Sequence, residues 1–401
     1  MKIAILLGDS RLESIIRARA LAEALLEATP MNGESIQVTI GLPVVDDGEW
    51  KRQAQWLRAG SSAIMVRRLD WREVPVDNAL RMHESSQPFV SLARCSNVLL
   101  PQDWGNNFTD CAAWVVLAEP GLGAVYPIRP TVFFCVELAS RRAPYAFCDD
   151  FRAPFWDRQL SAFQMWRQAG FVVTTDRLTA ADIVSYAGVS PDRVLYLPNS
   201  FDLHEIDDSR SMSGQPQRLM IRMEPDSLHD ADATLRGLHL YLSEGGELQP
   251  VIACQMSSAA FGSQSNIPAV VALPIEVRHL VEELPIEQLT TAAYWARLLY
   301  RASAVWSPRL SGQGSHLDWP LRVGRPLLSA DHPIAREVRQ RVGSAIVLYS
   351  PGSPSAVADA LHSFAADLAS APEPHLAAAD RTVQATQATL IVDRLLEIVD
   401  D

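Results

Sequence analysis

Short apolar runs alternate along the chain with longer segments whose apolar residues recur at helical spacing. This alternation is typical of parallel strands joined by crossover helices, because parallel strands are buried on both faces and need a helix to return the chain. In the first half, the runs predict strands at Ile3–Leu7, Gln37–Ile40, Ala63–Val66, Val98–Leu100, Thr131–Val136 and Phe171–Thr174. The pattern predicts an α/β protein with doubly wound parallel sheets.

The helix after Phe171–Thr174 has the clearest end signals. Either Thr175 or Asp176 can cap its first turn, since both side chains accept hydrogen bonds from free backbone N–H groups. Leu178, Ile183 and Val184 form its apolar stripe, and Gly188 followed by Pro191 ends it. The sequence therefore predicts a capped helix directly after the strand.

A polar segment, Ser200–Arg218, separates two such alternating halves and reads as a linker. The second half predicts strands at Leu219–Met223, Val251–Ala253, Val270–Leu273, Ala304–Ser307, Pro326–Ser329 and Ala345–Leu348, and helices at Ala231–Leu242, Ile286–Arg301, Ile334–Arg341 and Ser355–Ala369. Thr389–Val399 is an amphipathic segment without a local partner. We expect domains at 1–200 and 218–375, a linker at 201–217, a terminal helix within 376–401, and a ligand cleft built from strand carboxyl ends.

Almost every basic residue is an arginine: Lys2 and Lys51 are the only lysines among 401 residues. Chemistry that needs a lysine later in the chain, such as a Schiff base or a phosphate-loop lysine, is therefore disfavoured. Any bound phosphate must be held by arginine, hydroxyl groups or backbone N–H groups. The formal net charge of −12 also disfavours nucleic acid as a partner.

The cysteines and the hydropathy predict the cellular compartment. Five cysteines without CxxC spacing favour free thiols in a reducing cytoplasm over disulfides or a zinc site; they are Cys95, Cys111, Cys135, Cys148 and Cys254. No stretch reaches 18 apolar residues, so no membrane span is expected. We expect a cytoplasmic protein with at most peripheral contact to the inner membrane face.

Two blocks of sequence resemble a known family. Phe171–Asp202 contains a strand ending in Thr, a capped helix, a Gly-Val-x-Pro-x-Arg turn, and Pro198-Asn199-Ser200 with an Asp two residues on. Arg301–Pro351 contains Gly312, Gly314, Gly324-x-Pro326 and Ser329-x-Asp331. Together with the opening MKIAILLG, these resemble the GT-B glycosyltransferases of the large, mostly retaining family four, at low identity over most of the chain.

The resemblance implies two Rossmann-like domains that face each other across a cleft. It implies transfer of a sugar from a nucleotide diphosphate donor, held mainly by the second domain, to an acceptor held by the first. No cofactor and no obligatory metal are implied. In this architecture the final helix commonly crosses back to the first domain, so we expect residues 376–401 to do so.

The departures from the family pattern fall on functional positions. Ser311 and Trp319 stand where members carry two glutamates, and Ser227 stands where a lysine follows the donor-binding arginine by five residues. Arg222 matches that arginine. Near residues 130–137, where many members have a His beside the reacting sugar, Val136 and Glu137 are found instead. Position 227, where family members carry the lysine that binds the donor phosphate, therefore also lacks a lysine in this chain.

Donor-binding residues are expected at Gly8, Arg222, Ser311, Gly312, Gln313, Gly314, Ser315, His316, Asp318 and Trp319. Cleavage of the donor leaves negative charge on the phosphate, which Arg222, backbone N–H groups of the loop and the cationic form of His316 would stabilise. Asp318 would accept ribose hydroxyls and Trp319 would pack on the nucleotide. The alternatives are a surface Arg222, a plain turn at 312–316, a helix-terminal Asp318 and a core Trp319.

Acceptor-binding residues are expected in two loops of the first domain. Asp9 and Ser10 follow the first strand, and Asp103, Trp104, Asn106 and Asn107 follow the strand at Val98–Leu100, so both loops should lie at the same cleft rim. Tryptophan stacks on sugar faces, and Asp and Asn bind hydroxyls. An ordinary Gly-Asn turn is the alternative. Glu137 is a candidate to stabilise positive charge at the sugar carbon, or a common strand-end carboxylate.

A basic stretch rich in tryptophan contains Trp50, Arg67, Arg68, Trp71 and Arg72. Such a stretch can dock on an anionic membrane face or on a phosphorylated lipid acceptor. The alternative is a solvated helix face with partly buried aromatic rings.

The sequence as a whole predicts a glycosyltransferase that is retaining and metal-independent, with Glu137, Arg222 and His316 as candidate catalytic residues. Two other readings stay open. One is a non-catalytic GT-B protein that binds or activates a partner, because both glutamates and the lysine are replaced. The other is a nucleotide-sugar epimerase, which shares the fold but normally needs acid and base carboxylates.

Overall fold

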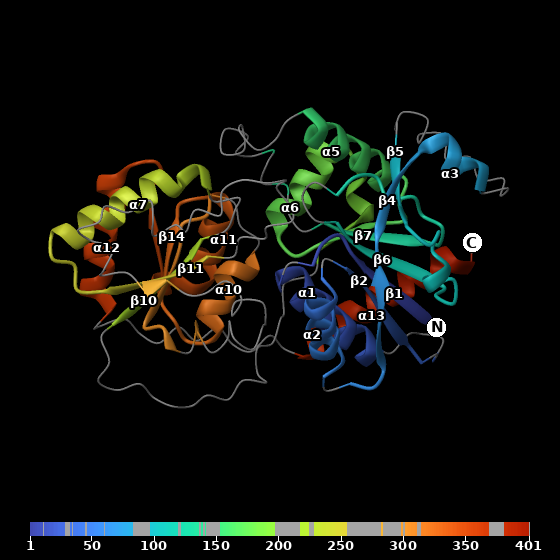
Figure 1. The fold of residues 1–401 in the computed structure, drawn as a ribbon, viewed down its shortest axis with the longest axis horizontal. Coiled ribbons are helices and arrows are strands. Elements are labelled where there is room, and N and C mark those ends of the chain that lie inside the picture. Colours follow the sequence, from blue (N-terminus) through green and yellow to red (C-terminus); the bar gives the residue numbers. More distant parts are fainter. Residues whose placement is uncertain are drawn as a thin grey trace. The chain divides into compact units, whose positions relative to one another are not determined.

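The computed structural model divides into two compact units (Figure 1). One unit comprises Met1–Leu138, Cys148–Phe201 and Ala379–Asp401, and the other comprises Ala139–Phe147 and Asp202–Ala378. The structure describes residues 1–10, 12–28, 33, 35–44, 46–59, 61–82, 97–118, 122–135, 138, 141, 153–196, 217–223, 228–254, 282–283, 298–299, 301–310, 314–368 and 381–400.

The first unit is built on a seven-stranded parallel sheet with the order β3-β2-β1-β6-β7-β8-β9. Its strands are β1 (Lys2–Leu7), β2 (Gln37–Pro43), β3 (Ile64–Leu69), β6 (Ala113–Ala118), β7 (Thr131–Cys135), β8 (Val172–Thr174) and β9 (Val194–Tyr196). Its helices are α1 (Leu12–Glu27), α2 (Asp47–Arg58), α3 (Val76–Met82), α5 (Ala153–Trp166), α6 (Arg177–Asp182) and α13 (Arg381–Asp400). The parallel-sheet prediction is confirmed.

The helix that follows β8 has a capping residue at its start and a glycine at its end. Asp176 is the N-cap of α6, and its side chain accepts the N–H of Thr179. A π-helical turn, Ile183–Ala187, continues the helix, and Gly188 ends it with a φ of 71°. Glycine suits that left-handed position because it carries no Cβ. The structure thus selects Asp176 over Thr175 as the cap.

The strand expected at Val98–Leu100 exists, but its place in the parallel sheet was predicted wrongly. It is β5 (Asn97–Pro101), and it pairs antiparallel with β4 (Trp71–Pro75) in a separate two-stranded sheet. The strand that lies beside β1 is β6, which the sequence analysis did not assign. All six residues of β6 are buried, so the apolar run that identified its neighbours β1 and β7 is also present here.

The second unit contains a six-stranded parallel sheet with the order β12-β11-β10-β13-β14-β15. Its strands are β10 (Arg218–Met223), β11 (Gln249–Cys254), β12 (Glu282–Glu283), β13 (Ala304–Ser307), β14 (Leu327–Ala330) and β15 (Ile346–Tyr349). Its helices are α7 (Leu228–Ser243), α10 (Gly314–Arg322), α11 (Pro333–Val342) and α12 (Pro354–Leu368). The expected strand at Val270–Leu273 and most of the helix at Ile286–Arg301 lie outside the described residues.

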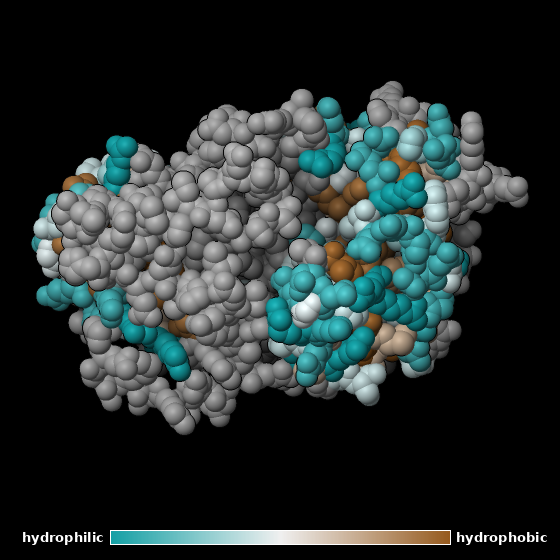
Figure 2. Space-filling view, in the orientation of Figure 1, coloured by the Kyte–Doolittle hydropathy of each residue, from teal (hydrophilic) through white to brown (hydrophobic). Residues whose placement is uncertain are grey.

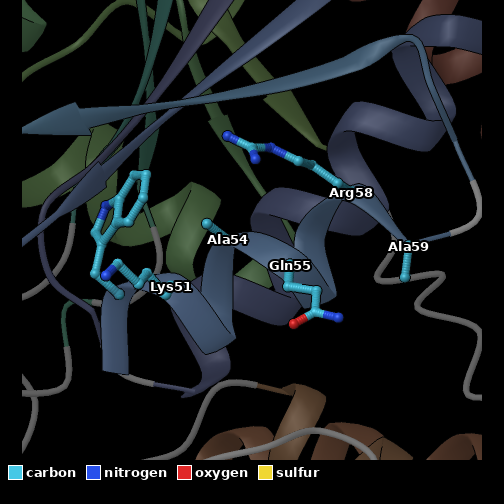
Figure 3. A pocket seen from close by; sticks show the side chains of 6 residues that line it. Lys51, Ala54, Gln55, Arg58 and Ala59 are labelled. Atoms are coloured by element: carbon cyan, nitrogen blue, oxygen red, sulfur yellow. The ribbon is translucent and has the colours of Figure 1, made fainter. Parts of the chain in front are cut away.

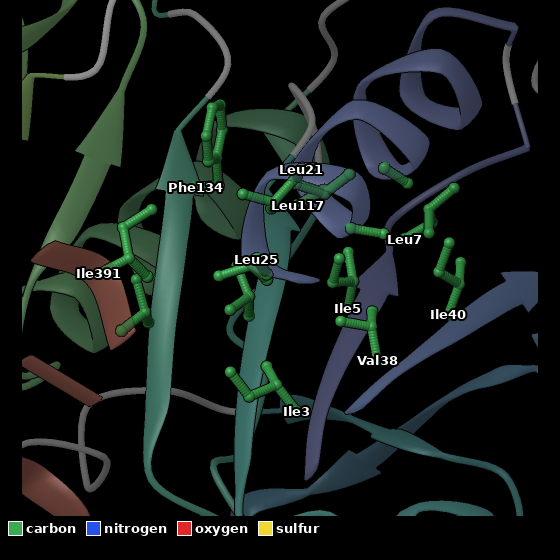
Figure 4. Close-up of a cluster of buried hydrophobic side chains, with 14 of the residues drawn as sticks. Ile3, Ile5, Leu7, Leu21, Leu25, Val38, Ile40, Leu117, Phe134 and Ile391 are labelled. Carbon is green, nitrogen blue, oxygen red and sulfur yellow. The ribbon is translucent and has the colours of Figure 1, made fainter. Parts of the chain in front are cut away.

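The final helix, α13, packs on α1 in the first unit (Figure 4). Ile391, Val392 and Leu395 join the buried cluster formed by β1, β2, β6 and α1, where Ile3, Ile5 and Leu25 are fully buried. The last segment of the chain therefore completes a core that begins at its first residues. This burial explains why Thr389–Val399 is amphipathic without a local partner.

Replacing Leu395 by Ala should destabilise the first unit by about 2 to 5 kcal/mol, because the lost side chain leaves a cavity in a core that begins at β1. Leu395 is 0% exposed, whereas Leu390 on the same helix is 43% exposed. Leu390→Ala is the matched control and should change the free energy of unfolding by less than about 0.5 kcal/mol. Urea unfolding of both variants measures the difference, and equal effects would show that α13 is not part of the core.

Candidate functional site

Each parallel sheet has one place where the chain reverses its direction of winding. In the first unit the chain passes from β1 outward to β2 and β3, then returns to build β6 on the other side of β1. In the second unit β10 has the same position between β11 and β13. Open parallel sheets bind ligands beyond the strand carboxyl ends at such a switch point. Residues near the carboxyl ends of β1 and β10 are therefore the best placed to contact a ligand.

Gly8 lies at the carboxyl end of β1, as the sequence predicted. A Cβ at this position would come within 3.1 Å of the carbonyl oxygen of Leu117, at the end of the neighbouring strand β6. The loop that follows Gly8 is held by hydrogen bonds to α1 and α2. Ser14 Oγ donates to Asp9 Oδ1 at 2.7 Å, and Gln53 Nε2 donates to the carbonyl of Ser10 at 3.3 Å. The residue type at Gly8 is thus set by the close approach of two strands.

Trp71 lies at this same edge and was missed as a site residue. Its indole Nε1–H donates to the carbonyl oxygen of Leu7 at 2.8 Å, at the last residue of β1. The sequence grouped Trp71 with the basic stretch, and no local signal ties it to β1, because 64 residues separate the two partners. Trp71 follows the last residue of β3 by two positions, so the strand order β3-β2-β1 brings it to the edge where β1 ends.

The loop containing Asp103, Trp104, Asn106 and Asn107 begins beside Trp71, because Pro101 pairs with Trp71 and the guanidinium of Arg72 lies 5.6 Å from the ring of Trp104. It follows β5, which is outside the parallel sheet. From Gln102, whose N–H donates to Asp70, the loop runs toward Asp110, which is ion-paired at 2.8 Å with Lys2 at the amino end of β1. The loop therefore starts near the carboxyl end of β3 and runs toward the amino end of β1, and acceptor binding by its residues stays a prediction.

Asp103 and Trp104 have local roles in this loop. The carboxylate of Asp103 accepts the N–H of Gly105 at 3.0 Å and that of Asn107 at 2.7 Å, which fixes the turn. Trp104 has a φ of 60°, an unfavourable value for a bulky residue, and is 38% exposed. The guanidinium of Arg72 lies 5.6 Å from its ring centroid.

The basic, tryptophan-rich stretch is engaged by partners within the first unit. Arg67 pairs with Asp110 at 2.7 Å, and Arg68 pairs with Asp47 at 2.9 Å while lying 5.1 Å from the ring of Trp50. Two guanidinium bonds, together with Lys2, hold the pKa of Asp110 well below its usual range. These contacts are the ones that the solvated-surface alternative predicts.

An open depression of about 360 Å³ runs along α2 (Figure 3). It is lined by Trp50, Lys51, Ala54, Gln55, Arg58 and Ala59. Its residues come from one helix and the residue after it, so no strand end contributes. Figure 2 shows that the described surface around these elements is mainly hydrophilic, with apolar side chains in small separate areas. Within the described part of the chain, no helix is long and apolar enough to cross a membrane.

Only the last part of the expected donor loop lies within the described residues. Glu137, Ser311, Gly312 and Gln313, like Pro198-Asn199-Ser200, lie outside the described residues. For Arg222, Gly314, Ser315 and His316 the backbone alone is described. Arg222 is the fifth residue of β10, close to the carboxyl end, and Gly314–His316 form the first turn of α10. The first N–H groups of a helix have no partner within it and attract anions.

Asp318 and Trp319 are interior residues of α10. Both are buried, and Asp318 Oδ1 accepts a hydrogen bond from Arg341 of α11 at 3.0 Å. The side chain of Asp318 is only 3% exposed, so a ribose hydroxyl could reach its carboxylate only if neighbouring side chains moved. Trp319 is thus a core tryptophan, as the alternative had it, whereas Asp318 is the fifth residue of α10 and not the helix N-terminal acid of that alternative.

Two further polar residues, Arg309 and His332, lie past the carboxyl ends of β13 and β14, and the sequence analysis did not select either. Ser307 of β13 pairs in register with Ser329 of β14, and Arg309 and His332 each follow the last residue of their strand by two residues. Both are buried. His332 is the N-cap of α11, where its Nδ1 accepts the N–H of Ala335 at 3.3 Å. Histidine is an uncommon N-cap residue. Its place at a helix start is the only feature of the sequence that could have drawn attention to His332.

Burial lowers the pKa of His332 to about 4, and the positive charge of Arg309 acts in the same direction. At neutral pH the ring is therefore uncharged. The negative charge of Asp331 opposes this shift, but Asp331 itself is held by Arg336 in a two-point ion pair at 2.6 and 2.9 Å.

No described group of three or more His, Cys, Asp or Glu side chains could hold a metal ion. Two of the cysteines, Cys111 and Cys135, are buried free thiols, and burial raises the pKa of Cys111 to about 11. A thiol that stays protonated at neutral pH is a poor nucleophile.

No protein-family model matches the sequence, and no curated protein matches it. Solved structures share its fold over nearly the full chain. HepE of Anabaena, solved with UDP and glucose, is 14% identical, covers 100% of this chain and 97% of its own, and has a TM-score of 0.57. WaaG, a glycosyltransferase involved in lipopolysaccharide biosynthesis, is 12% identical, with a TM-score of 0.58 and coverage of 100% and 99%.

UDP-N-acetylglucosamine 2-epimerase from Rickettsia bellii is 11% identical, with a TM-score of 0.60 and coverage of 100% of this chain and 97% of that chain. Proteins of two reaction types thus share this architecture. The likeness confirms the GT-B fold of two Rossmann-like domains that the sequence resemblance implied.

Replacing His332 by Asn should make the second unit less sensitive to acid. Between pH 6.5 and 4 the unfolded chain protonates His332 whereas the folded chain does not, so wild-type stability falls as the pH falls. Asn can cap the helix but does not titrate. The wild type should lose about 1.4 kcal/mol per pH unit relative to His332→Asn between pH 6 and 5. Urea unfolding in phosphate-free buffer measures this slope, and parallel pH profiles would contradict it.

Proposed function

We propose that this protein is a glycosyltransferase that moves a sugar from a nucleotide diphosphate donor to an acceptor hydroxyl. The observation that carries the proposal is the fold shared with HepE, solved with UDP and glucose, and with WaaG, a glycosyltransferase, over essentially the whole chain. The beginning of α10 at Gly314, inside the segment where the sequence resemblance places a donor loop, supports the same reading.

The second unit would hold the donor. Arg222 lies near the carboxyl end of β10, the central strand at the switch point, and the free N–H groups of Gly314, Ser315 and His316 open α10. Both arrangements stabilise negative charge, which grows on the departing diphosphate as the bond to the sugar breaks. Arginine supplies a two-point contact to phosphate that does not depend on a lysine. In this proposal Arg222 and the first turn of α10 do the work for which other members use a lysine.

The first unit would hold the acceptor beside Gly8, Asp9 and Ser10. Trp71, whose indole is bonded to Leu7, adds an aromatic ring at that edge, and aromatic rings pack against sugar faces. The acceptor hydroxyl would attack on the side of the leaving group, with a donor phosphate oxygen as base, so the configuration is retained and no metal is needed. Proximity and phosphate stabilisation would supply most of the rate enhancement.

An epimerase is the second candidate, because a UDP-N-acetylglucosamine 2-epimerase shares the fold with a TM-score of 0.60. Such a reaction requires groups that remove and return a proton at a sugar carbon. The two candidates differ in product: a transferase releases a nucleoside diphosphate, whereas an epimerase returns an intact nucleotide sugar.

A thermal-shift panel of UDP-, GDP-, dTDP- and ADP-sugars tests the shared premise of both candidates. A donor that binds only the folded protein should raise the free energy of unfolding by about 2.7 kcal/mol at roughly one hundred times its Kd. Arg222→Gln should abolish the shift. Arg218→Gln, at the opposite end of β10, is the matched control and should leave it unchanged.

The products then separate the candidates. Release of nucleoside diphosphate that requires Arg222 supports the transferase, and recovery of an epimerised nucleotide sugar supports the epimerase. Absence of any shift across the panel would contradict both and favour the non-catalytic reading.

A further inference from the structure

Trp104 adopts a backbone conformation that its residue type disfavours. Among the described residues it is the only one other than glycine with a positive φ, at 60°. Trp104 and Gly105, whose φ is 79°, occupy the two central positions of a type I′ turn. The N–H of Asn106 closes this turn by donating to the carbonyl of Asp103 at 3.2 Å. Such positions favour Gly, Asn or Asp, so the chain carries an indole ring where local structure favours a small residue.

The surroundings hold this strained turn in place. The carboxylate of Asp103 accepts the N–H groups of Gly105 and Asn107. The N–H of Trp104 donates to the carbonyl of Pro101 at 2.8 Å. Strained backbone persists only where neighbouring contacts fix it, and such residues are concentrated at ligand-binding sites. The indole of Trp104 is thus carried by a fixed backbone, although the residue is 38% exposed.

A cation accompanies the exposed ring. The guanidinium of Arg72, on the neighbouring strand β4, lies 5.6 Å from the centroid of the Trp104 ring. Arg72 is itself exposed, and no carboxylate among the described residues forms an ion pair with it. Glu73, the next residue, accepts a hydrogen bond from Asn97 at 3.0 Å, and Asp103 binds its own turn. A positive charge is therefore available beside an aromatic surface.

The turn is tied to the ligand-binding edge of the first sheet. Pro101, which binds the N–H of Trp104, is the partner of Trp71 in the β4–β5 pair. Trp71 in turn donates to the carbonyl of Leu7 at the end of β1. Arg72 follows Trp71 and lies on the opposite face of β4, because successive strand residues alternate between faces. The ring and the guanidinium therefore form a separate surface beside that edge.

We propose that Arg72 and Trp104 form a subsite for an anionic sugar, one that carries a carboxylate or a phosphate group. The apolar face of the sugar ring would pack on the indole, and the guanidinium would bind the anionic group by two parallel hydrogen bonds. An acidic protein with a formal net charge of −12 needs such a local cation to hold an anionic ligand. That this sugar belongs to the acceptor rests on the proposed function.

Three glycosides with the same ring test the subsite. They are methyl β-glucoside, methyl β-glucuronide and the phosphate ester of methyl β-glucoside at the same exocyclic carbon, and they differ only in the group at that carbon. Ligand-observed NMR at low ionic strength measures the Kd of each for the full chain. The wild type should bind an anionic glycoside about fivefold more tightly than the neutral one, since a charge-assisted hydrogen bond is partly screened at an exposed site. The glycoside that shows the gain identifies the anionic group.

Two substitutions separate the charge from the ring. Arg72→Gln should remove the preference for the anionic glycoside. Trp104→Asn should raise the Kd of all three by about fivefold, because the ring is lost while Asn suits the positive φ. The matched controls are Arg52→Gln and Tyr186→Asn, which remove the same kinds of exposed side chain elsewhere in the first unit. Both should leave every Kd unchanged.

The unliganded melting temperature of each variant identifies a folding defect, and Trp104→Tyr, which keeps an aromatic ring, should retain most of the affinity. Equal Kd values for the three glycosides in the wild type, or an unchanged preference in Arg72→Gln, would overturn the subsite. Binding to vesicles of anionic phospholipid that both Arg72→Gln and Trp104→Asn lose, without any glycoside binding, would also overturn it and would assign the pair to a membrane surface.

The thermal shift with nucleotide sugars separates this inference from the proposed function. Arg72→Gln and Trp104→Asn should keep the donor shift, because both residues belong to the first unit and the donor is assigned to the second. A donor shift in a protein that does not prefer anionic glycosides would overturn the subsite and leave the proposed function standing. A preference that depends on both residues, in a protein that binds no nucleotide sugar, would support the subsite and contradict the proposed function.

Discussion

The pairing of one central strand with parallel neighbours on both sides determines where every other element of each unit lies. β1 is bonded to β2 and to β6, and β10 is bonded to β11 and to β13. Such a strand is buried on both faces, so the helices must cover both and the loops after the strands meet at one edge. The interior of β1 shows this constraint directly: Ile3–Leu7 are fully buried.

The two units use this edge differently. In the first unit the end of β1 is crowded: Gly8 lies against the backbone of β6, and the indole of Trp71 caps the carbonyl of Leu7. In the second unit the ends of β13 and β14 carry buried polar groups, Arg309 and His332, above a core that is also partly polar, since Trp306 Nε1 donates to Tyr349 at 3.2 Å. Buried polar groups are costly unless they are paired.

The sequence predicted most strands of both parallel sheets, because a strand buried on both faces is a short, purely apolar run that is easily read. The cap at Asp176 and the helix end at Gly188 could also be predicted from the sequence, because each depends on residues only a few positions away. Where the order of strands had to be inferred, prediction failed. Val98–Leu100 and Ala113–Ala118 are both apolar runs, and composition gives no indication that the second lies beside β1 while the first joins β4.

The candidate site shows the same division between local and distant causes. From the sequence alone came the GT-B fold, the position of Gly8 at the end of β1 and the absence of lysine from later phosphate contacts. The tertiary structure alone showed that Asp318 pairs with Arg341, that Asp103 holds its own turn and that Trp71 lies at the end of β1. Local signals record which element a residue belongs to. The partner of a polar side chain depends on which strands lie side by side, and that is decided by packing of the whole sheet.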